Sequence, residues 1–379
     1  MGLTTHILGS TGVEITRVTE HRGAITHEGE LYPSPRQGLD YLDLEPPGPG
    51  HAVPLGMNLY WARIPLPMEL NHINVWLLDD GEGGWLLVDT GMAEDVCREA
   101  WGSLEQDLLR GRPLRRILVT HDHPDHMGLA GWLAQRHGAP LWMSASGHGS
   151  TLEFLATPGE EVDARRLRFV ASHGMEVSPE APRRTGGGTE HGRWYGAVPP
   201  LERAVAGGDR IEAGGRSWDV IETSGHCRGH LCLHDAANRV LISGDQVLPT
   251  ISPNVSVLAT RPDANPLAEF LESLDRLERL CAPDTLVLPS HGRPFRGLHR
   301  RIAVLRSHHL QQLDALREAC REPKCAYALL PVMYGRPLRG FHRFLAVGET
   351  VAHLNHLWHG GAVERRQDEA GSVTFVRSG

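Results

Sequence analysis

Residues 117–128 read ILVTHDHPDHMG, an apolar run followed directly by a cluster of histidines and aspartates. The apolar run predicts a buried β-strand, and the polar residues then occupy the loop at its end. Imidazole and carboxylate groups crowded after a buried strand would repel one another or leave donors unpaired unless a cation resolved them. The loop therefore predicts a metal site, with four candidate ligands: His121, His123, Asp125 and His126.

The composition is that of a globular protein: 379 residues, 40% hydrophobic and 22% charged, with a formal net charge of −8. This length allows one large core and a smaller accessory domain, since single cores stop growing at about 250 to 300 residues. The negative charge offers no general attraction for nucleic acid or an anionic membrane. No segment approaches the roughly 18 apolar residues of a membrane-spanning helix, and no signal-peptide pattern opens the chain. We therefore expect a cytoplasmic protein without a membrane partner.

Alternating strand and helix patterns predict an α/β domain in the middle of the chain. Residues 1–55 mix short β-type stretches with a Pro/Gly-rich end and are interpreted as an N-terminal extension. Residues 56–295 form the main domain, in which an arginine-rich and glycine-rich stretch at about 147–208 is interpreted as an inserted lid. Residues 296–379 predict three helices and a terminal hairpin, the pattern of a small winged-helix domain.

Three further polar residues follow apolar runs and stand beside glycine. They are His226 in TSGHC, Asp245 in LISGD and His291 in LVLPSHG. Open α/β sheets collect ligands at strand ends, and glycine lets the backbone pack closely around a compact cluster. These residues are therefore predicted to meet the first loop at one edge of the sheet.

Together these motifs resemble those of the metallo-β-lactamase superfamily. HDHPDH at 121–126 is similar to its His-x-His-x-Asp-His motif, and LVDTG at 87–91 is similar to its Val-Asp-Thr-Gly turn, in which the aspartate (here Asp89) supports the metal loop without ligating. The resemblance covers about residues 57–295. It implies a four-layer αββα sandwich, and the C-terminal region resembles the small helical, winged-helix-like domain attached to some hydrolases of this superfamily.

The resemblance also implies two groups of metal ligands and a residue that bridges them. One metal would be held by His121, His123 and His226, the second by Asp125, His126 and His291, and Asp245 would bridge the two. The implied enzyme is a dinuclear metal-dependent hydrolase in which a hydroxide shared by two divalent ions attacks the substrate. Zinc is the expected metal, with iron or manganese as alternatives. Asp125 is implied as the catalytic residue, the group closest to a general base.

Two positions near these motifs bear on the branch of the superfamily. GHCRGH at 225–230 is similar to the family's Gly-His-Ser/Thr-x-Gly-His, in which the second histidine, here His230, is structural. Cys227 replaces the usual hydroxyl residue and is interpreted as a packed, neutral side chain. Asp245 stands where many zinc β-lactamases carry cysteine or serine. This difference argues against antibiotic hydrolysis and favours the glyoxalase II, lactonase, ribonuclease Z and sulfatase branches.

The favoured substrate is a small acyl compound, namely an ester, thioester or lactone. The lid residues Trp194 and Tyr195, together with its arginines, suit an anionic and partly apolar molecule, and the apolar segment 246–255 is expected to line the pocket. The C-terminal domain would then cap the pocket or form a homodimer contact.

Two other functions remain open. One is a phosphodiesterase or endoribonuclease on single-stranded RNA, and the other is a non-catalytic sensor that binds nucleic acid. The sensor would bind DNA through the winged helix, and the ribonuclease would use basic residues of the helix predicted from residue 298, which could contact phosphates. These residues are Arg300, Arg301, Arg306, His308 and His309.

Overall fold

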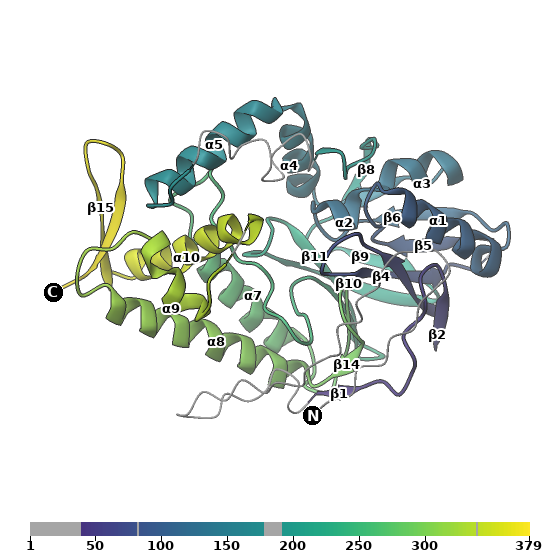
Figure 1. The fold of residues 1–379 in the computed structure, drawn as a ribbon. Coiled ribbons are helices and arrows are strands. Elements are labelled where there is room, and N and C mark those ends of the chain that lie inside the picture. The colour runs from purple at the N-terminus through teal and green to yellow at the C-terminus, as the bar shows by residue number, and fades with distance from the viewer. Residues whose placement is uncertain (1–38, 82, 178–191, 339) are drawn as a thin grey trace, which may run out of the picture. The chain divides into compact units, whose positions relative to one another are not determined.

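The computed structural model describes residues 39–81, 83–177, 192–338 and 340–379, and in these residues the strands form two seven-stranded sheets and a separate hairpin (Figure 1). In spatial order the first sheet contains β2 (Ala52–Gly56), β3 (Leu59–Pro65), β4 (His72–Asp79), β5 (Trp85–Val88), β6 (Leu114–Leu118), β7 (Leu141–Met143) and β8 (Leu201–Ala204). The second contains β1 (Asp40–Tyr41), β14 (Phe295–Arg296), β13 (Leu286–Pro289), β12 (Val240–Gly244), β11 (His230–Asp235), β10 (Arg216–Thr223) and β9 (Arg210–Ala213).

Helices fill the connections between these strands. The first half of the chain contains α1 (Asp95–Leu104), the π-helical turn η1 (Glu105–Leu109), α2 (Pro124–Met127), α3 (Ala130–His137), α4 (Ala145–Ala156) and α5 (Gly159–Ser172). The second half contains α7 (Pro266–Leu280), α8 (Leu298–Ala319), the 3-10 turn η3 (Tyr327–Leu329), α9 (Leu330–Tyr334) and α10 (Phe341–His359), followed by the hairpin of β15 (Val363–Gln367) and β16 (Val373–Arg377). None of the helices in the described part of the chain is both long and apolar enough to cross a membrane.

The layering follows from the alternation of side chains along each strand. In β4, Trp76 and Leu78 enter the core between the two sheets, whereas Val75 and Leu77 enter the core between the first sheet and its helices. Successive side chains of a strand point to opposite faces, so one apolar strand supplies two cores. Helices α1 and α3 cover the outer face of the first sheet, and α7 covers that of the second. The predicted four-layer αββα sandwich is confirmed.

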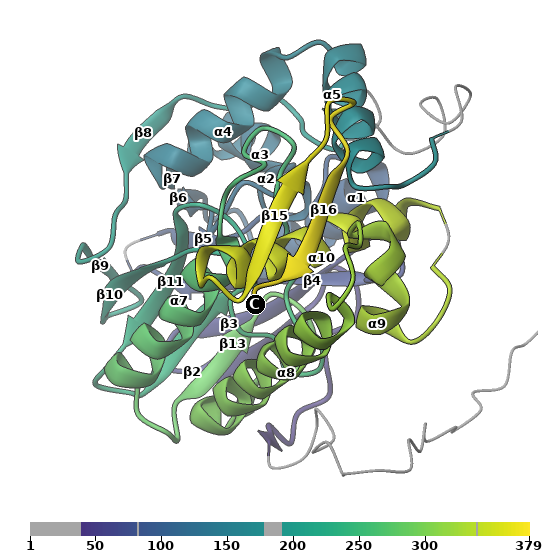
Figure 2. The ribbon, with the colours of Figure 1, turned by 90° about the vertical axis from the view of Figure 1, so that its left-hand side faces the viewer.

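The C-terminal helices continue the core on the outer face of the second sheet. Leu241 of β12 and Phe270 of α7 belong to the same buried cluster as Leu305 of α8, Val347 of α10 and Phe375 of β16. Figure 2 shows α8 and α10 side by side with the hairpin of β15 and β16. The predicted helices and terminal hairpin are therefore present, while the winged-helix assignment stays a prediction.

Parts of the predicted N-terminal extension and lid have regular structure. Strand β1 pairs with β14, and β2 pairs with β3, although β1 and all of β2 except Gly56 lie in the predicted extension of residues 1–55. Helices α4 and α5 occupy the first part of the predicted lid. Residues 1–38 and 178–191 lie outside the described residues, so the boundaries at 55 and at 147–208 stay predictions.

Candidate metal centre

The loop of residues 121–126 is held in place by a buried aspartate at the end of the neighbouring strand. Asp89, which follows β5, accepts hydrogen bonds from the backbone nitrogen of Thr120 at 2.8 Å and from Nδ1 of His126 at 2.8 Å. Its backbone has φ of +65°, a conformation that costs a non-glycine residue on the order of 1–3 kcal/mol. The hydrogen bonds to the loop offset this strain, so Asp89 acts as the anchor of the loop.

The ends of four strands bring the predicted ligands together. The 121–126 loop follows β6, and His226, Asp245 and His291 follow β10, β12 and β13. Asp245 lies in the middle: one carboxylate oxygen is 3.5 Å from Nε2 of His126 and 3.5 Å from Nε2 of His291, and the other is 3.5 Å from Nε2 of His226. Asp125 lies 3.3 Å from Nε2 of His291. All seven predicted site residues thus meet at one edge of the sandwich, where strand ends of both sheets come together, and not at the edge of a single sheet as expected.

Their potential ligand atoms form overlapping groups, within each of which all atoms lie within 4.8 Å of one another. Asp245 shares a group with His121 and His126, which come from the two ligand sets predicted by the sequence. The groups are His121, His123, His226 and Cys227; His121, His126 and Asp245; and Asp125, His126 and His291.

Several atoms that face this centre are buried and have no hydrogen-bond partner. They are Nε2 of His126, Nε2 of His226, Nε2 of His291 and Oδ1 of Asp245. An unpaired buried polar atom costs about 1–3 kcal/mol, and a cation would satisfy several such atoms at once. The residues therefore fit a divalent metal.

Each histidine of the centre has an outer hydrogen-bond partner for its other ring nitrogen. Metal-ligating histidines almost always have such a partner, which fixes the orientation of the ring and the nitrogen that faces the metal. The outer contacts are His121 Nδ1 with Thr120 Oγ1 at 3.1 Å, His123 Nε2 with Cys227 Sγ at 3.4 Å, His126 Nδ1 with Asp89 at 2.8 Å, His226 Nδ1 with the Asn254 carbonyl at 2.8 Å, and His291 Nδ1 with the His72 carbonyl at 2.8 Å.

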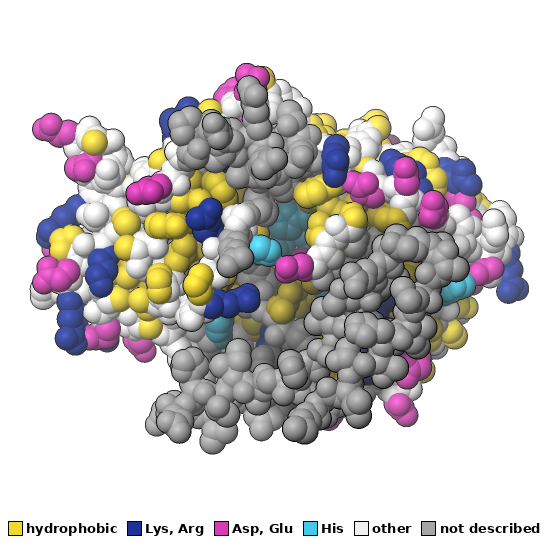
Figure 3. Space-filling model, viewed as in Figure 1, with side chains coloured by type: hydrophobic (Ala, Val, Ile, Leu, Met, Phe, Trp, Pro, Cys, Tyr) yellow, Lys and Arg dark blue, Asp and Glu magenta, His cyan; other side chains and the backbone are white. Residues whose placement is uncertain are grey.

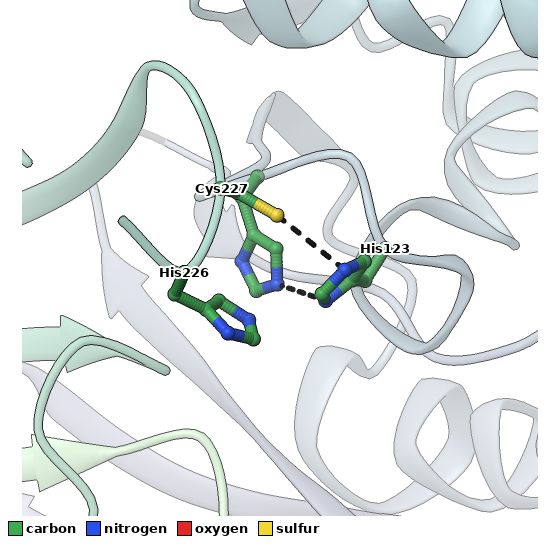
Figure 4. Close-up of side chains that lie close together, drawn as sticks. His123, His226 and Cys227 are labelled. Atoms are coloured by element: carbon green, nitrogen blue, oxygen red, sulfur yellow. Dashed lines mark hydrogen bonds between the residues drawn. The ribbon is translucent and has the colours of Figure 1, made fainter. Parts of the chain in front are cut away.

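Cys227 contacts the Nε2 edge of the His123 ring, the edge that is not directed at His121. Nδ1 of His123 lies 3.0 Å from Nε2 of His121, and the thiol lies on the Nε2 side of the same ring (Figure 4). A proton on Nε2 of His123 directed at this sulfur would leave Nδ1 free to accept a metal. Cys227 was expected to be a packed, neutral side chain, and the structure adds that it orients a candidate ligand.

His230 supports the centre from behind. It is buried, and its Nε2 accepts a hydrogen bond of 3.1 Å from the backbone nitrogen of Asp245. The preceding residue, Gly244, has φ of +52°, and a Cβ placed there would lie 2.4 Å from Nε2 of His230. Glycine at 244 is therefore required for His230 to reach the backbone of Asp245.

Burial and neighbouring charges shift the pKa values of the candidate ligands. Burial alone would raise the pKa of Asp125, but His126 and His291 outweigh it and lower the value to about 2. Burial would likewise raise the pKa of Asp245, and the same two histidines instead hold it well below its usual range. Burial, together with the neighbouring His123, lowers the pKa of His226 to about 4. The centre thus offers anionic carboxylates and, at His226, a neutral imidazole, the forms that bind metal. For His126 and His291, nearby carboxylates outweigh burial and raise the pKa, so a bound metal would displace a proton from each.

The predicted lid contacts the loop of residues 121–126 through Tyr195. The hydroxyl of Tyr195 donates a hydrogen bond of 2.6 Å to the backbone carbonyl of Asp122. Histidine side chains are visible in a hollow near the middle of the face shown in Figure 3. The described part of the predicted lid therefore borders the centre.

Sequence reasoning missed most of the outer partners. His72 and Asn254 act through backbone carbonyls, which leave no residue-type signal. Thr120 was adjacent to the motif, and a hydroxyl beside a ligand histidine is a signal that could have found it.

A sandwich of two sheets with a histidine and carboxylate cluster at the strand ends defines the class of metal-dependent hydrolases. The chain belongs to the metallo-beta-lactamase superfamily, whose pattern it matches over residues 68–291. Residues 313–378 match the "Metallo-beta-lactamase-like, C-terminal domain".

Known proteins agree with this assignment. A solved structure, a beta-lactamase domain protein from Burkholderia ambifaria, is 40% identical with a TM-score of 0.81, covering 90% of this chain and 98% of that one. The acyl-coenzyme A thioesterase MBLAC2 of Gallus gallus is 28% identical over 250 residues, which are 64% of this chain and 80% of that protein. A hydroxyacylglutathione hydrolase from Fuscovulum blasticum is 31% identical over 226 residues, 60% of this chain and 64% of that protein.

Proposed function

We propose that the chain hydrolyses a thioester, or a related ester, of a small acyl compound with the help of two divalent metal ions, most simply zinc. The position of Asp245 carries the proposal of two ions, because its carboxylate lies 3.5 Å from histidines of both groups. His121, His123 and His226 would hold one ion, and Asp125, His126 and His291 the other. The names of the two relatives, an acyl-coenzyme A thioesterase and a hydroxyacylglutathione hydrolase, support the substrate class.

The ions would supply an activated water at neutral pH and a Lewis acid for the carbonyl oxygen. The residues of the chain supply position and proton handling. Asp89 and Thr120 fix the rings of His126 and His121, so little reorganisation is needed during the reaction. The side chain of Asp125 is 15% exposed, more than those of Asp245 and His291, and is therefore the carboxylate best placed to accept a proton from water.

The basic residues of α8 argue against RNA as the substrate. Arg300 pairs with Asp40 at 3.0 Å, and Arg306 pairs with Asp275 at 2.6 Å and Glu278 at 2.8 Å. Arg301 and His309, which also seemed available for phosphates, are only 2% and 0% exposed. A phosphate backbone is bound by exposed cations. Of the five residues of α8 expected to contact phosphates, Arg300 and Arg306 are ion-paired, Arg301 and His309 are buried, and His308 is exposed.

The test is a comparison of substrates with purified, metal-loaded protein. Acyl-coenzyme A thioesters, S-acylglutathiones, lactones and single-stranded RNA are assayed in parallel, with the metal content measured on the same samples. Thioesters are expected to be cleaved fastest, with two metals per chain. Faster cleavage of RNA would overturn the substrate class, and a single tightly bound metal at full activity would overturn the dinuclear site.

Matched variants connect the activity to the centre. Asp245→Asn should lower kcat/KM by at least about a hundredfold, because it removes a charge shared by both groups. Asp284→Asn is the control, since Asp284 is an exposed residue whose side chain pairs with Arg239. Equal losses in the two variants would disconnect the activity from the centre.

A further inference from the structure

The segment between β12 and α7, residues 245–265, has no helix or strand of its own, and we call it the Asp245 loop. Long irregular loops inside a compact domain are usually functional, and their backbone groups need partners outside regular structure. Val247, Leu248, Val255 and Val257 of this loop are buried in or beside the core. The loop is therefore packed into the molecule, and the C-terminal helices supply many of its polar partners.

Helix α8 binds the first half of the loop through a buried arginine. Arg301 donates hydrogen bonds to the carbonyl of Leu248 at 2.6 Å and to the carbonyl of Ile251 at 2.7 Å. A buried guanidinium is costly, and these two carbonyls, in place of a carboxylate, are the groups it binds. His309, which lies on the same helix about two turns after Arg301, contacts the hydroxyl of Ser252 at 3.2 Å. Arg301 thus fixes the path of the backbone shortly before Asn254.

Helix α10 binds the second half of the loop at a glycine. The carbonyl of Gly348 accepts a hydrogen bond of 3.1 Å from the backbone nitrogen of Val257. A Cβ at position 348 would lie 3.2 Å from both Cβ and Oγ of Ser256. Ser256 in turn donates a hydrogen bond of 2.6 Å to the side chain of Asn254. The glycine lets α10 approach the loop closely on the other side of Asn254.

Between these two contacts the loop reaches the candidate metal centre. The backbone carbonyl of Asn254 accepts a hydrogen bond of 2.8 Å from Nδ1 of His226. The opposite nitrogen, Nε2, is buried without a hydrogen-bond partner and lies 3.5 Å from Asp245. A shift of the Asn254 carbonyl would therefore release the ring that presents Nε2 to the centre.

We infer that the C-terminal helices position a metal ligand: α8 through Arg301 and α10 through Gly348 hold the Asp245 loop so that the Asn254 carbonyl orients His226. The inference rests on the proposed function in one respect, namely that His226 is a metal ligand. The C-terminal helices would then help to form the metal site, instead of only covering the substrate pocket as expected from the sequence. Arg301 and Gly348 are positioning residues, since neither touches the candidate ligands directly.

The test uses Gly348→Ala in the full-length protein, with Gly102→Ala as the matched control. Both glycines lie in helices, where alanine is favoured by about 1 kcal/mol. A Cβ at Gly102 meets nothing within 4 Å, whereas one at Gly348 presses on Ser256. Zinc affinity is measured by competition with a chromophoric chelator, and the environment of the metal is followed by the visible spectrum of the cobalt-substituted protein.

Gly348→Ala is expected to weaken one of the bound metals by about tenfold, at the lower end of the effect of altering an outer partner. Its cobalt spectrum should change, its thioesterase activity should recover at high zinc concentration, and its metal-free form should unfold no earlier than the wild type. Arg301→Lys, which retains the charge but loses the forked geometry, should weaken the same metal. Gly102→Ala should leave the affinity and the spectrum unchanged.

Two outcomes would overturn the inference, and they differ in what else they affect. If His226→Ala leaves both metals bound, the ligand assignment is wrong and the positioning role falls with it. If His226→Ala weakens binding while Gly348→Ala and Arg301→Lys bind zinc like the wild type, only the positioning role is wrong. In that second case the proposed hydrolase is unaffected.

Discussion

The carboxylate of Asp89 and the imidazole of His126 are joined by a hydrogen bond of 2.8 Å, and both side chains are buried. Asp89 also accepts hydrogen bonds from the backbone nitrogen and the hydroxyl of Thr120. One carboxylate therefore sets the backbone of the 121–126 loop and the ring orientation of a candidate ligand. It does so without being among the residues whose ligand atoms group together.

Asp89→Asn should lower metal affinity by about 10- to 100-fold, because the amide offers a donor where His126 and Thr120 need an acceptor. Asparagine tolerates the left-handed backbone at this position, so the change tests hydrogen bonding and not strain. Zinc competition with a chelator measures the effect. Wild-type affinity in this variant would show that Asp89 does not set the orientation of His126.

Cys227→Ala should also weaken metal binding, since it removes the outer partner of His123 at 3.4 Å. Cys227→Ser should retain more of the affinity, because a hydroxyl can still accept a hydrogen bond from Nε2 of His123. Cys281, which is buried and does not belong to the groups of potential ligand atoms, provides the control as Cys281→Ala. Zinc affinity is expected to be highest in the wild type, lower in Cys227→Ser and lowest in Cys227→Ala. An alanine variant equal to the wild type would mean that the thiol is only packed there.

Removal of metal by a chelator should lower the midpoint of thermal unfolding without changing the secondary structure. A ligand that binds only the folded state stabilises it by about 4 kcal/mol at a thousandfold excess over its Kd. The sheets have their own apolar cores, so the metal-free protein should remain folded at 25 °C. Circular dichroism and calorimetry on the same sample check both parts. A midpoint that does not depend on the metal would contradict the fit of the centre to a cation.

Acid should destabilise the metal-free protein through a buried histidine pair between α8 and α10. Nδ1 of His309 lies 3.0 Å from Nε2 of His353. Burial, together with His353, lowers the pKa of His309 to about 2. Burial also lowers the pKa of His353 to about 4, partly opposed by its hydrogen bond to the Glu349 carbonyl. The unfolded chain binds these protons near pH 6.5, so the stability is present above that value and is lost as the pH falls towards 4.

The loss should amount to about 1.4 kcal/mol per pH unit for each such histidine. Urea unfolding of the metal-free protein at pH 7, 6 and 5 measures the slope. His353→Gln should reduce the slope of the unfolding free energy with pH by about 1.4 kcal/mol per pH unit. His342→Gln, at an exposed position on the same helix, should leave the slope unchanged. Equal slopes in the two variants would show that the pair is not the source.

The sequence predicts the ligand-bearing positions well because they are tied to strand ends. His121, Asp245 and His291 each follow a short apolar run, and that periodicity is local information. The layered sandwich was likewise implied, since the motifs resemble a known family. The positions that hold the ligands were harder to find. The Asn254 carbonyl reaches His226 from an irregular loop whose path depends on contacts with helices far along the chain, and Arg301, expected to be available for phosphates, is buried.

The buried cluster that runs from β12 through α7 to α10 makes the two parts of this chain poor candidates for modular exchange. A truncation after β14 would remove apolar neighbours of Phe270 and Leu241 and expose a hydrophobic surface prone to aggregation. A graft of a foreign C-terminal region would need the matching face of the second sheet as well. Substitutions in one part must therefore be accommodated by the other, so the two should diverge together among relatives that keep both.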